Sequence, residues 1–261
     1  MSDSPNWSDV EDVIARAEAT GAILGVAISS PGGARFSHHG GRGFAAASTV
    51  KIAIMIELFR QIDAGRLSLE QHRLYRAEDK TNGSGVIMHL RPGLNFTLYD
   101  LAYLMMSISD NAATNMLIDL VGMEAVNATM RAMGMVKSVL GHKMAGRPAL
   151  ACEIENWAVP DEYLAMMSLI LAGEAASAES CAQMVALLET QQNNRRIGRF
   201  LKRPEGPRWG SKTGSLPGVV NDVGFVMTEA GPLCLAVFCE GVEALAGEEM
   251  IGLIAQAALR V

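Results

Sequence analysis

Short apolar runs typical of β-strands stand near both ends of the chain. Most are rich in β-branched or aromatic residues and are bounded by Gly, Pro, Asn or Ser. The expected strands lie at 22–29, 35–39, 208–212, 222–228 and 233–239. Because these runs come from both ends of the sequence, we expect the termini to meet in one antiparallel sheet.

The middle of the chain has longer apolar patterns with few internal Gly or Pro residues, which favour helices. The expected helices lie at 48–64, 97–108, 111–120, 123–133, 160–172 and 178–191, with two more at 8–20 and 243–259. The sequence therefore predicts an α/β fold, in which both termini form an antiparallel sheet with flanking helices and the middle forms an all-helical lobe. We place the α/β lobe at residues 1–46 and 196–261 and the helical lobe at 47–195.

Composition and charge narrow the classes of function. The chain has 261 residues, of which 49% are hydrophobic and 19% charged, as in an ordinary globular protein with a large core. The net charge is −6, and the longest basic block, at 193–196, is too short to follow a phosphate backbone. We interpret its two arginines as a helix cap and expect no nucleic-acid partner.

The sequence gives no indication of a membrane protein or an exported one. No segment has the length and apolar character of a transmembrane helix, and residues 1–7 have neither the basic region nor the apolar stretch of a signal peptide. We therefore expect a cytoplasmic protein with no membrane partner. The oligomeric state is left undefined by the sequence.

Histidine and cysteine patterns argue against a metal or a cofactor. The five histidines form no H-E-x-x-H motif, and the adjacent pair His38 and His39 favours a turn or strand end over metal ligands. The cysteines show no C-x-x-C spacing, and Cys234 and Cys239 are expected on opposite faces of one strand. We expect reduced thiols, no metal and no cofactor.

Three short motifs follow one another in an order that outlines a serine acyl-transfer site. A serine hydroxyl is a weak nucleophile near neutral pH, so a base must take its proton as it attacks a carbonyl carbon. Lysine can be that base only if burial or a neighbouring cation lowers its pKa. Each motif alone is common by chance, but together they indicate this chemistry. They are Ser48-Thr49-Val50-Lys51, Ser109-Asp110-Asn111 and Lys212-Thr213-Gly214.

The first motif fits the start of a helix. Ser48 and Lys51 are three positions apart, which places them on one helical face within hydrogen-bonding reach. The free N–H groups of a helix N-terminus favour negative charge that develops at Ser48. Lys212 is the candidate second cation that lowers the pKa of Lys51.

The motif set resembles the class A β-lactamases and penicillin-binding proteins, which carry Ser-x-x-Lys, Ser-Asp-Asn and Lys-Thr-Gly. The spacing of the motifs is close to that of the family, and the resemblance runs from about residue 20 to the C-terminus. The family fold has the same two lobes, with the active site in the cleft between them. The flanking segments that also look familial are Gly83-Ser84-Gly85-Val86, Leu90-Arg91-Pro92-Gly93, Thr97-Leu98-Tyr99-Asp100-Leu101 and Asn111-Ala112-Ala113-Thr114-Asn115.

The resemblance implies a catalytic role for three residues. By motif position, Ser48 would be the acylated nucleophile and Lys51 its proton acceptor. Ser109 would return a proton to the leaving group. Asp110, the middle residue of the second motif, is interpreted as structural.

The resemblance also implies how a substrate would be held. Asn111 would bind the amide side chain of the substrate, and Lys212 and Thr213 would anchor its carboxylate, with Gly214 completing the motif. The oxyanion hole would consist of the backbone N–H groups of Ser215 and of the nucleophilic serine, two donors aimed where negative charge develops.

One departure from the family pattern limits the analogy. Class A β-lactamases deacylate with a glutamate in a Glu-x-x-Leu-Asn motif, which acts through a water molecule, and this motif is absent here. The segment 156–163 resembles the end of the loop that carries it, but the loop from about Gly141 is shorter. Glu153 and Glu155 lie too near its end to align with the catalytic residue. We interpret both as solvated loop carboxylates.

Three functions remain open. The first is a serine hydrolase that acts through a Ser48 acyl-enzyme on a small carboxylate-bearing amide, lactam or ester. The second is a β-lactamase that hydrolyses β-lactam antibiotics, which would need Glu153, Glu155 or an unusual water to deacylate. The third is a slowly acylating penicillin-binding or sensing module. Each predicts a small-molecule substrate as the partner.

Overall fold

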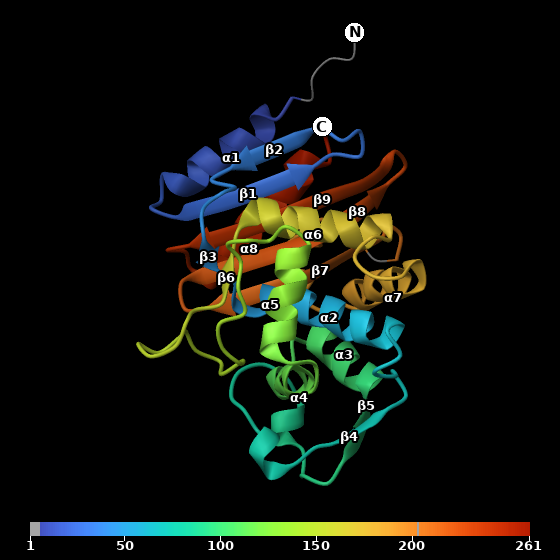
Figure 1. The fold of residues 1–261 in the computed structure, drawn as a ribbon. Helices are drawn as coiled ribbons and strands as arrows, with labels where there is room; N and C mark the ends of the chain where they lie inside the picture. The colour runs from blue at the N-terminus through green and yellow to red at the C-terminus, as the bar shows by residue number, and fades with distance from the viewer. Residues whose placement is uncertain (1–5, 203) are drawn as a thin grey trace.

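A five-stranded antiparallel sheet forms one side of the molecule, in a computed structural model that describes residues 6–202 and 204–261 (Figure 1). Its strands lie in the order β2-β1-β9-β8-β7. Because β1 pairs with β9, the two ends of the chain meet in one sheet, as predicted. The strands are β1 (Ile23–Ser29), β2 (Arg35–His38), β7 (Trp209–Leu216), β8 (Val219–Thr228) and β9 (Gly231–Glu240).

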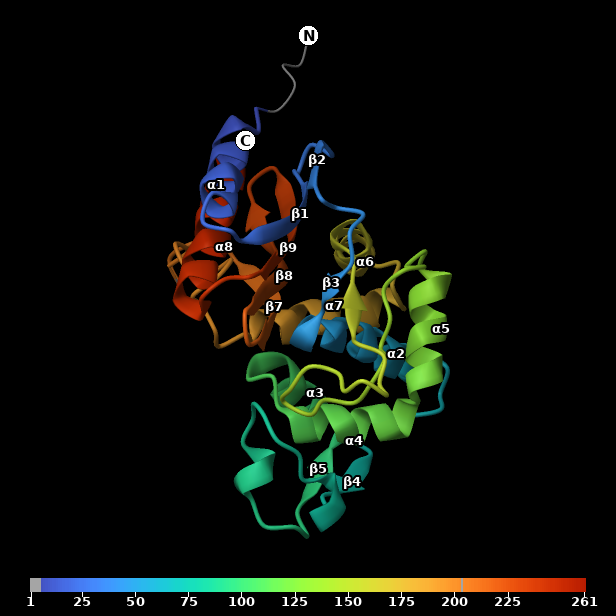
Figure 2. The same cartoon turned by 90° about the vertical axis from the view of Figure 1, so that its left-hand side faces the viewer.

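Helices cover both faces of this sheet (Figure 2). On one face, α1 (Ser8–Glu18) and α8 (Ala244–Ala258) pack on the apolar side chains that the strands direct toward them. On the other face the sheet packs against the helical lobe. Cys234 contributes to the core on the helical-lobe side and Cys239 to the core under α1 and α8, which confirms that the two thiols face opposite ways.

The helical lobe is built around α2 (Lys51–Asp63), whose residues from Lys51 to Phe59 are all buried. A helix buried on every side must be enclosed by other elements, and several other helices of the lobe pack against α2. Among the described residues, no helix is long and apolar enough to cross a membrane. The remaining helices are α3 (Leu98–Ser107), α4 (Asn111–Val121), α5 (Met123–Ala132), α6 (Pro160–Ala172) and α7 (Ala178–Glu189).

The sequence does not predict several short elements, because segments of two to four residues are too short to show a periodic pattern. They include the 3₁₀ turn η1, which precedes α2, so the predicted helix at 48–64 begins as a tighter turn. The hairpin of β7 and β8 is also longer than expected and reaches into the Lys-Thr-Gly motif. The short elements are β3 (Phe44–Ala45), η1 (Ala47–Val50), β4 (His72–Leu74), η2 (Ala77–Asp79), η3 (Ile87–His89), β5 (Asn95–Thr97) and β6 (Trp157–Ala158).

Candidate active site

A cavity of about 360 Å³ lies where β7 meets the helical lobe, and the three motifs converge on it. Lys51, Lys212 and Gly214 are buried next to this lining. The structure therefore brings all the predicted site residues together, although they come from an N-terminal turn, a helix start and a C-terminal strand. Those that line the cavity are Ser48, Ser109, Asn111, Thr213 and Ser215.

Close packing of β7 fixes the turn that carries Ser48. Ala47, directly before it, has a φ of +47°, a strained conformation for a residue with a side chain. A Cβ atom at Gly214 would lie 2.8 Å from the carbonyl oxygen of Ala46 and 3.1 Å from the nitrogen of Ser48. Only glycine allows this approach, which is why the Lys-Thr-Gly motif lies directly against the turn that carries Ser48.

Lys51 is completely buried, and its Nζ donates to three acceptors of the second motif. They are the Ser109 carbonyl oxygen at 2.7 Å, Ser109 Oγ at 3.0 Å and Asn111 Oδ1 at 2.8 Å. Burial lowers the pKa of Lys51 well below its usual value, and the charge of Lys212 lowers it further, while Asp110 opposes the shift. The lysine therefore has the lowered pKa that the chemistry requires.

The direct hydrogen bond expected between Ser48 and Lys51 is not found among the described residues. A lysine ammonium has three donors and no acceptor, and Ser109 and Asn111 already occupy all three donors of Lys51. Only the neutral amine has a lone pair that can accept the proton of Ser48. The arrangement thus describes a resting site in which Lys51 is held beside Ser109.

Ser109 adopts an unusual backbone conformation that explains this contact. Its φ is +61°, in the left-handed region, where non-glycine residues are uncommon. Both its carbonyl oxygen and its hydroxyl then lie at the Lys51 amine, and Ser84 Oγ donates to the same carbonyl at 2.8 Å. Because Ser109 contacts the Lys51 amine and also lines the cavity, its hydroxyl can pass a proton from that amine to a group bound in the cavity.

Asp110 orders the start of α4, in keeping with its interpretation as structural. Its Oδ1 caps the helix by accepting from the Ala113 N–H at 3.0 Å. Its Oδ2 accepts from the N–H groups of Val86 at 2.7 Å and Ile87 at 2.9 Å. One buried carboxylate therefore fixes both the second motif and the segment that faces it.

Lys212 lies on β7 and is also fully buried. Its Nζ donates to the Thr213 carbonyl oxygen at 2.9 Å. Burial lowers the pKa of Lys212 to about 7; the carboxylate of Asp222 opposes this shift and the guanidinium of Arg196 adds to it. Lys212, the predicted second cation of the site, therefore gains or loses its charge near neutral pH.

Arg196 was interpreted as a helix cap, and this was wrong. Its guanidinium is buried under the β7–β8 hairpin, where it donates to the carbonyl oxygens of Gly214 and Asn221 and, at 2.6 Å, to Ser215 Oγ. The sequence places Arg196 in a polar block with no periodicity, so no local signal points to this long-range contact. It adds a positive charge beside the predicted carboxylate anchor.

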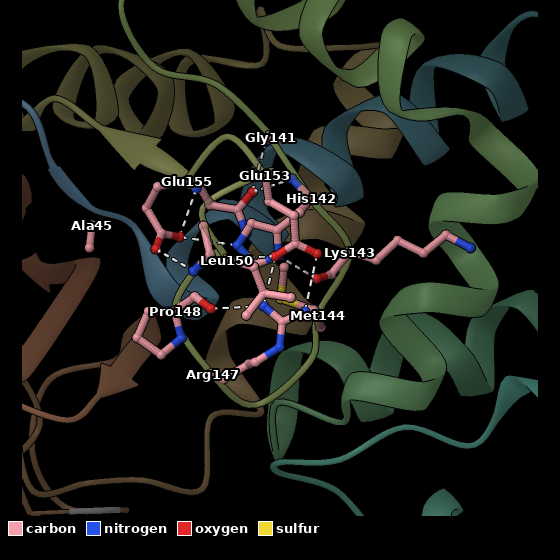
Figure 3. A network of polar contacts seen from close by, with 12 residues as sticks. Ala45, Gly141, His142, Lys143, Met144, Arg147, Pro148, Leu150, Glu153 and Glu155 are labelled. Atoms are coloured by element: carbon pink, nitrogen blue, oxygen red, sulfur yellow. Dashed lines mark hydrogen bonds and ion pairs between the residues drawn. The ribbon is translucent and has the colours of Figure 1, made fainter.

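The two loop glutamates differ, and the expectation that both are solvated was wrong for Glu155. Glu153 accepts from both terminal nitrogens of Arg147, at 2.7 and 3.1 Å, and from the Leu150 N–H at 2.8 Å (Figure 3). The hydrogen bonds from Arg147 hold the pKa of Glu153 at about 2. Glu155 instead lines the cavity together with Ser48, and only 16% of its side chain is exposed.

Glu155 is enclosed because the loop folds back on itself. It accepts from the N–H groups of Ala149 at 2.9 Å and Asn156 at 2.8 Å, and contacts His142 Nε2 at 3.1 Å (Figure 3). Burial raises the pKa of Glu155, but these hydrogen bonds outweigh it, so the net shift is downward. His142 belongs to no sequence motif used above, whereas Asn156 begins the segment 156–163 that resembles the end of the family loop; both residues line the cavity.

Asn156 links this loop to the turn that carries Ser48. Its carbonyl oxygen accepts from the Ala46 N–H at 2.6 Å, two residues before Ser48. Its Oδ1 accepts from the N–H groups of Gly141 at 2.8 Å and His142 at 3.1 Å. The position and shape of the loop are therefore fixed relative to Ser48.

A buried lysine pair around a cavity-lining serine, between a five-stranded sheet and a helical lobe, defines a serine hydrolase of the class A β-lactamase type. The model of the β-lactamase enzyme family matches residues 6–261, and the chain belongs to this family. The family resemblance drawn from the three motifs is thereby confirmed.

Individual relatives agree with this assignment. A β-lactamase from Sphaerobacter thermophilus DSM 20745 has a crystal structure that superposes with a TM-score of 0.96 at 56% identity, over 98% of this chain and 97% of that one. The structure of PBP-A shares the fold, with a TM-score of 0.86 at 23% identity over 97% and 95% of the two chains. A β-lactamase of Rhodobacter capsulatus is 34% identical over 136 residues, which are 51% of this chain and 46% of that one.

Proposed function

We propose that the protein opens a cyclic or linear amide, with a β-lactam as the best match, by forming an acyl-enzyme at Ser48. The substrate would carry a carboxylate. The observation that carries the proposal is the buried, electrostatically interacting pair of Lys51 and Lys212 next to the cavity that Ser48 lines. The names of the relatives from Sphaerobacter and Rhodobacter support the β-lactam as the substrate class.

In the proposed acylation step, neutral Lys51 takes the hydroxyl proton as Ser48 Oγ attacks the carbonyl carbon. The C–N bond then breaks, and the proton passes from Lys51 through Ser109 Oγ to the departing nitrogen. The 3.0 Å contact between Lys51 Nζ and Ser109 Oγ supports this route. The backbone N–H groups of Ser48 and Ser215 would hold the negative charge on the carbonyl oxygen.

The substrate carboxylate would bind where positive charge is concentrated. Lys212 and Arg196 supply that charge, and the hydroxyl groups of Thr213 and Ser215 lie at the cavity wall in front of it. Asn111 would hold the acyl side chain, although Lys51 already occupies its Oδ1 and its Nδ2 donates to the Asn82 carbonyl oxygen. Contact with substrate would therefore exchange one of these hydrogen bonds.

Deacylation is expected to be the slow step. Glu155 is the carboxylate that lines the Ser48 cavity, but its hydrogen bonds lower its pKa and so make it a weaker base for water. This observation favours, as a second candidate function, a penicillin-binding module that acylates and releases product slowly. The two functions share the acyl-enzyme and differ only in how long it lasts.

The test is mass spectrometry of the purified protein after exposure to a chromogenic cephalosporin, to p-nitrophenyl esters and to D-amino-acid amides. We expect one covalent adduct on the peptide that contains Ser48, and no adduct in the Ser48→Ala variant. Circular dichroism of the variant serves as the control for folding. Labelling of a correctly folded Ser48→Ala protein to the same extent would refute the assignment of the nucleophile.

A further inference from the structure

Three metal-ligating side chains meet at the outer edge of the sheet. They are Glu18, the last residue of α1, His38, the last residue of the edge strand β2, and His39, which follows it. One ligand atom from each lies within 4.8 Å of the other two. Among the described residues that line the Ser48 cavity, none belongs to this cluster, so the mechanism above leaves it without a role.

The backbone explains why two adjacent histidines point to the same place. In a strand, successive side chains point to opposite faces, so His38 and His39 would diverge if β2 continued. The strand ends at His38, however, and His39 takes a φ of +47°, in the left-handed region. The two ring centroids come within 4.2 Å of each other as a result.

The carboxylate of Glu18 stands beside both rings. Its Oε1 lies 2.9 Å from His38 Nε2 and 3.7 Å from His39 Nδ1. The Leu24 carbonyl oxygen also lies 3.0 Å from His39 Nδ1, so an ion bound by this nitrogen would replace that hydrogen bond. Glu18 and His38 are partly buried, with 31% and 29% of their side chains exposed, and His39 is more open at 49%.

Contrary to the expectation of no metal drawn from the sequence, we propose that Glu18, His38 and His39 bind a divalent transition-metal ion, with Zn²⁺ as the best match. Zn²⁺ takes imidazole nitrogen and carboxylate oxygen at about 2.0–2.2 Å in a tetrahedral set, which places neighbouring donors roughly 3.4 Å apart. The separations of 2.9 and 3.7 Å bracket that value, so small side-chain rotations suffice. Mg²⁺ and Ca²⁺ prefer oxygen donors and would bind far more weakly.

Space for the remaining ligand is present. A shallow cavity of about 250 Å³ adjoins the cluster and is lined by Glu11, Phe36 and Ser37 as well as by Glu18 and His38. Three protein ligands leave one tetrahedral position, which a water molecule in this cavity would fill. The ion would join the end of α1 to edge strand β2 and so stabilise the folded protein in proportion to its concentration.

The test is a titration of the metal-free full-length protein with ZnCl₂ by isothermal calorimetry. Cys152→Ser serves as the parent, because Cys152 is an exposed thiol that could bind Zn²⁺ by itself. We expect one equivalent to bind, with at least tenfold weaker binding in the His38→Gln/His39→Gln double variant. The matched control is His72→Gln/His89→Gln, which removes two exposed histidines elsewhere and should bind like the parent.

Two further measurements distinguish a specific metal site from nonspecific metal binding. Co²⁺ in place of Zn²⁺ should give the visible absorption of a tetrahedral nitrogen and oxygen site, lost in the His38→Gln/His39→Gln variant. The melting temperature of the parent should rise with ZnCl₂ and not with MgCl₂. Equal Zn²⁺ affinity in the parent and in a folded double variant, or no binding to either, would overturn the proposal. Both outcomes are independent of acylation at Ser48.

Discussion

Lys51 meets two requirements that usually conflict, complete burial and a free amine. Burial penalises its charged form, while three acceptors from Ser109 and Asn111 partly compensate that penalty. The nearby charge of Lys212 shifts the balance toward the neutral amine. Lys51 can therefore act as a proton acceptor at a pH where an exposed lysine would be fully charged.

Replacing Lys51 should then remove the base while leaving the nucleophile in place. We expect Lys51→Ala to slow acylation of Ser48 by roughly 10²–10⁴-fold, the usual scale for a positioned general base. Lys51→Arg should be equally slow, since a guanidinium does not lose its proton near neutral pH. Stopped-flow acylation with a chromogenic cephalosporin measures both. An unchanged rate in either variant would mean that another group is the base.

Lys212 should make binding of a carboxylate depend on pH. Its pKa of about 7 means that it loses its charge as the pH rises through neutrality. We expect the KM of a carboxylate-bearing cephalosporin to rise between about pH 6 and pH 9, and the KM of its methyl ester to stay nearly constant. Parallel profiles for the acid and the ester would show that Lys212 does not anchor the carboxylate.

The lowered pKa of Lys212 also makes the free energy of unfolding depend on pH. The folded protein holds Lys212 at a pKa below its ordinary value of 10.5, so between about pH 7 and 10.5 the unfolded chain binds more protons than the folded chain. The contribution of Lys212 to the free energy of unfolding therefore rises with pH across that window. Lys212→Met, which removes the titrating group, should flatten this part of the stability profile measured by urea unfolding.

At the scale of elements, the start of α4 combines a helix cap with two of the candidate site residues. Asp110 satisfies the N–H groups of Val86, Ile87 and Ala113 with one carboxylate, and Ser109 and Asn111 flank it. We expect Asp110→Ala to reduce the free energy of unfolding by about 1–3 kcal/mol, the cost of leaving buried donors unsatisfied. Acylation should fall as well, because the contacts of Ser109 and Asn111 with Lys51 depend on the same turn.

Thr97→Ala is the matched control for this variant. Thr97 caps α3 by accepting from the Asp100 N–H at 3.0 Å, and it is not among the residues that line the cavity. Its loss should cost a comparable 0.5–2 kcal/mol or so in stability and leave acylation unchanged. If both variants lose acylation in proportion to stability, the effect of Asp110 is general destabilisation and not positioning of the second motif.

The sequence predicts those elements that are long and periodic and misses those that depend on distant partners. The sheet formed by both termini and the burial of α2 follow from runs of apolar residues, and both are confirmed. The two-residue strands β3 and β6 pair only because chain segments far apart in sequence meet, so no local pattern precedes them.

The same distinction holds for the site. The residues of the three motifs lie in or next to the lining of one cavity, and the sequence could indicate them because each motif is local. Arg196 and Glu155 acquire their positions from backbone groups on other segments or from a loop folded on itself. Their environments are properties of the tertiary structure, which explains why a helix cap and a solvated carboxylate were the natural but incorrect expectations.

At the scale of the whole molecule, the sheet and helical lobe bring together the groups that we propose acylate Ser48, and the loop at 141–156 lies beside them. Asn156 fixes this loop to the turn that carries Ser48, and Glu155 of the loop lines the cavity. Two backbone N–H donors hold the carboxylate of Glu155, His142 Nε2 contacts it, and these contacts lower its pKa, so Glu155 is a weakened base for activating water. We therefore expect a β-lactam to acylate Ser48 and to leave slowly.

Slow release should appear as a Ser48 peptide whose mass is increased by one β-lactam and that persists for minutes or longer. Steady-state cephalosporin hydrolysis should remain well below the median enzyme turnover of about 10 s⁻¹. Glu155→Gln should then change the release rate little, as should the matched variant Glu153→Gln, whose parent residue is bound to Arg147. If hydrolysis is instead rapid, and Glu155→Gln but not Glu153→Gln traps the acyl-enzyme, Glu155 is the deacylating base. The protein would then be an efficient β-lactamase, with its base placed later in the loop than in the family motif.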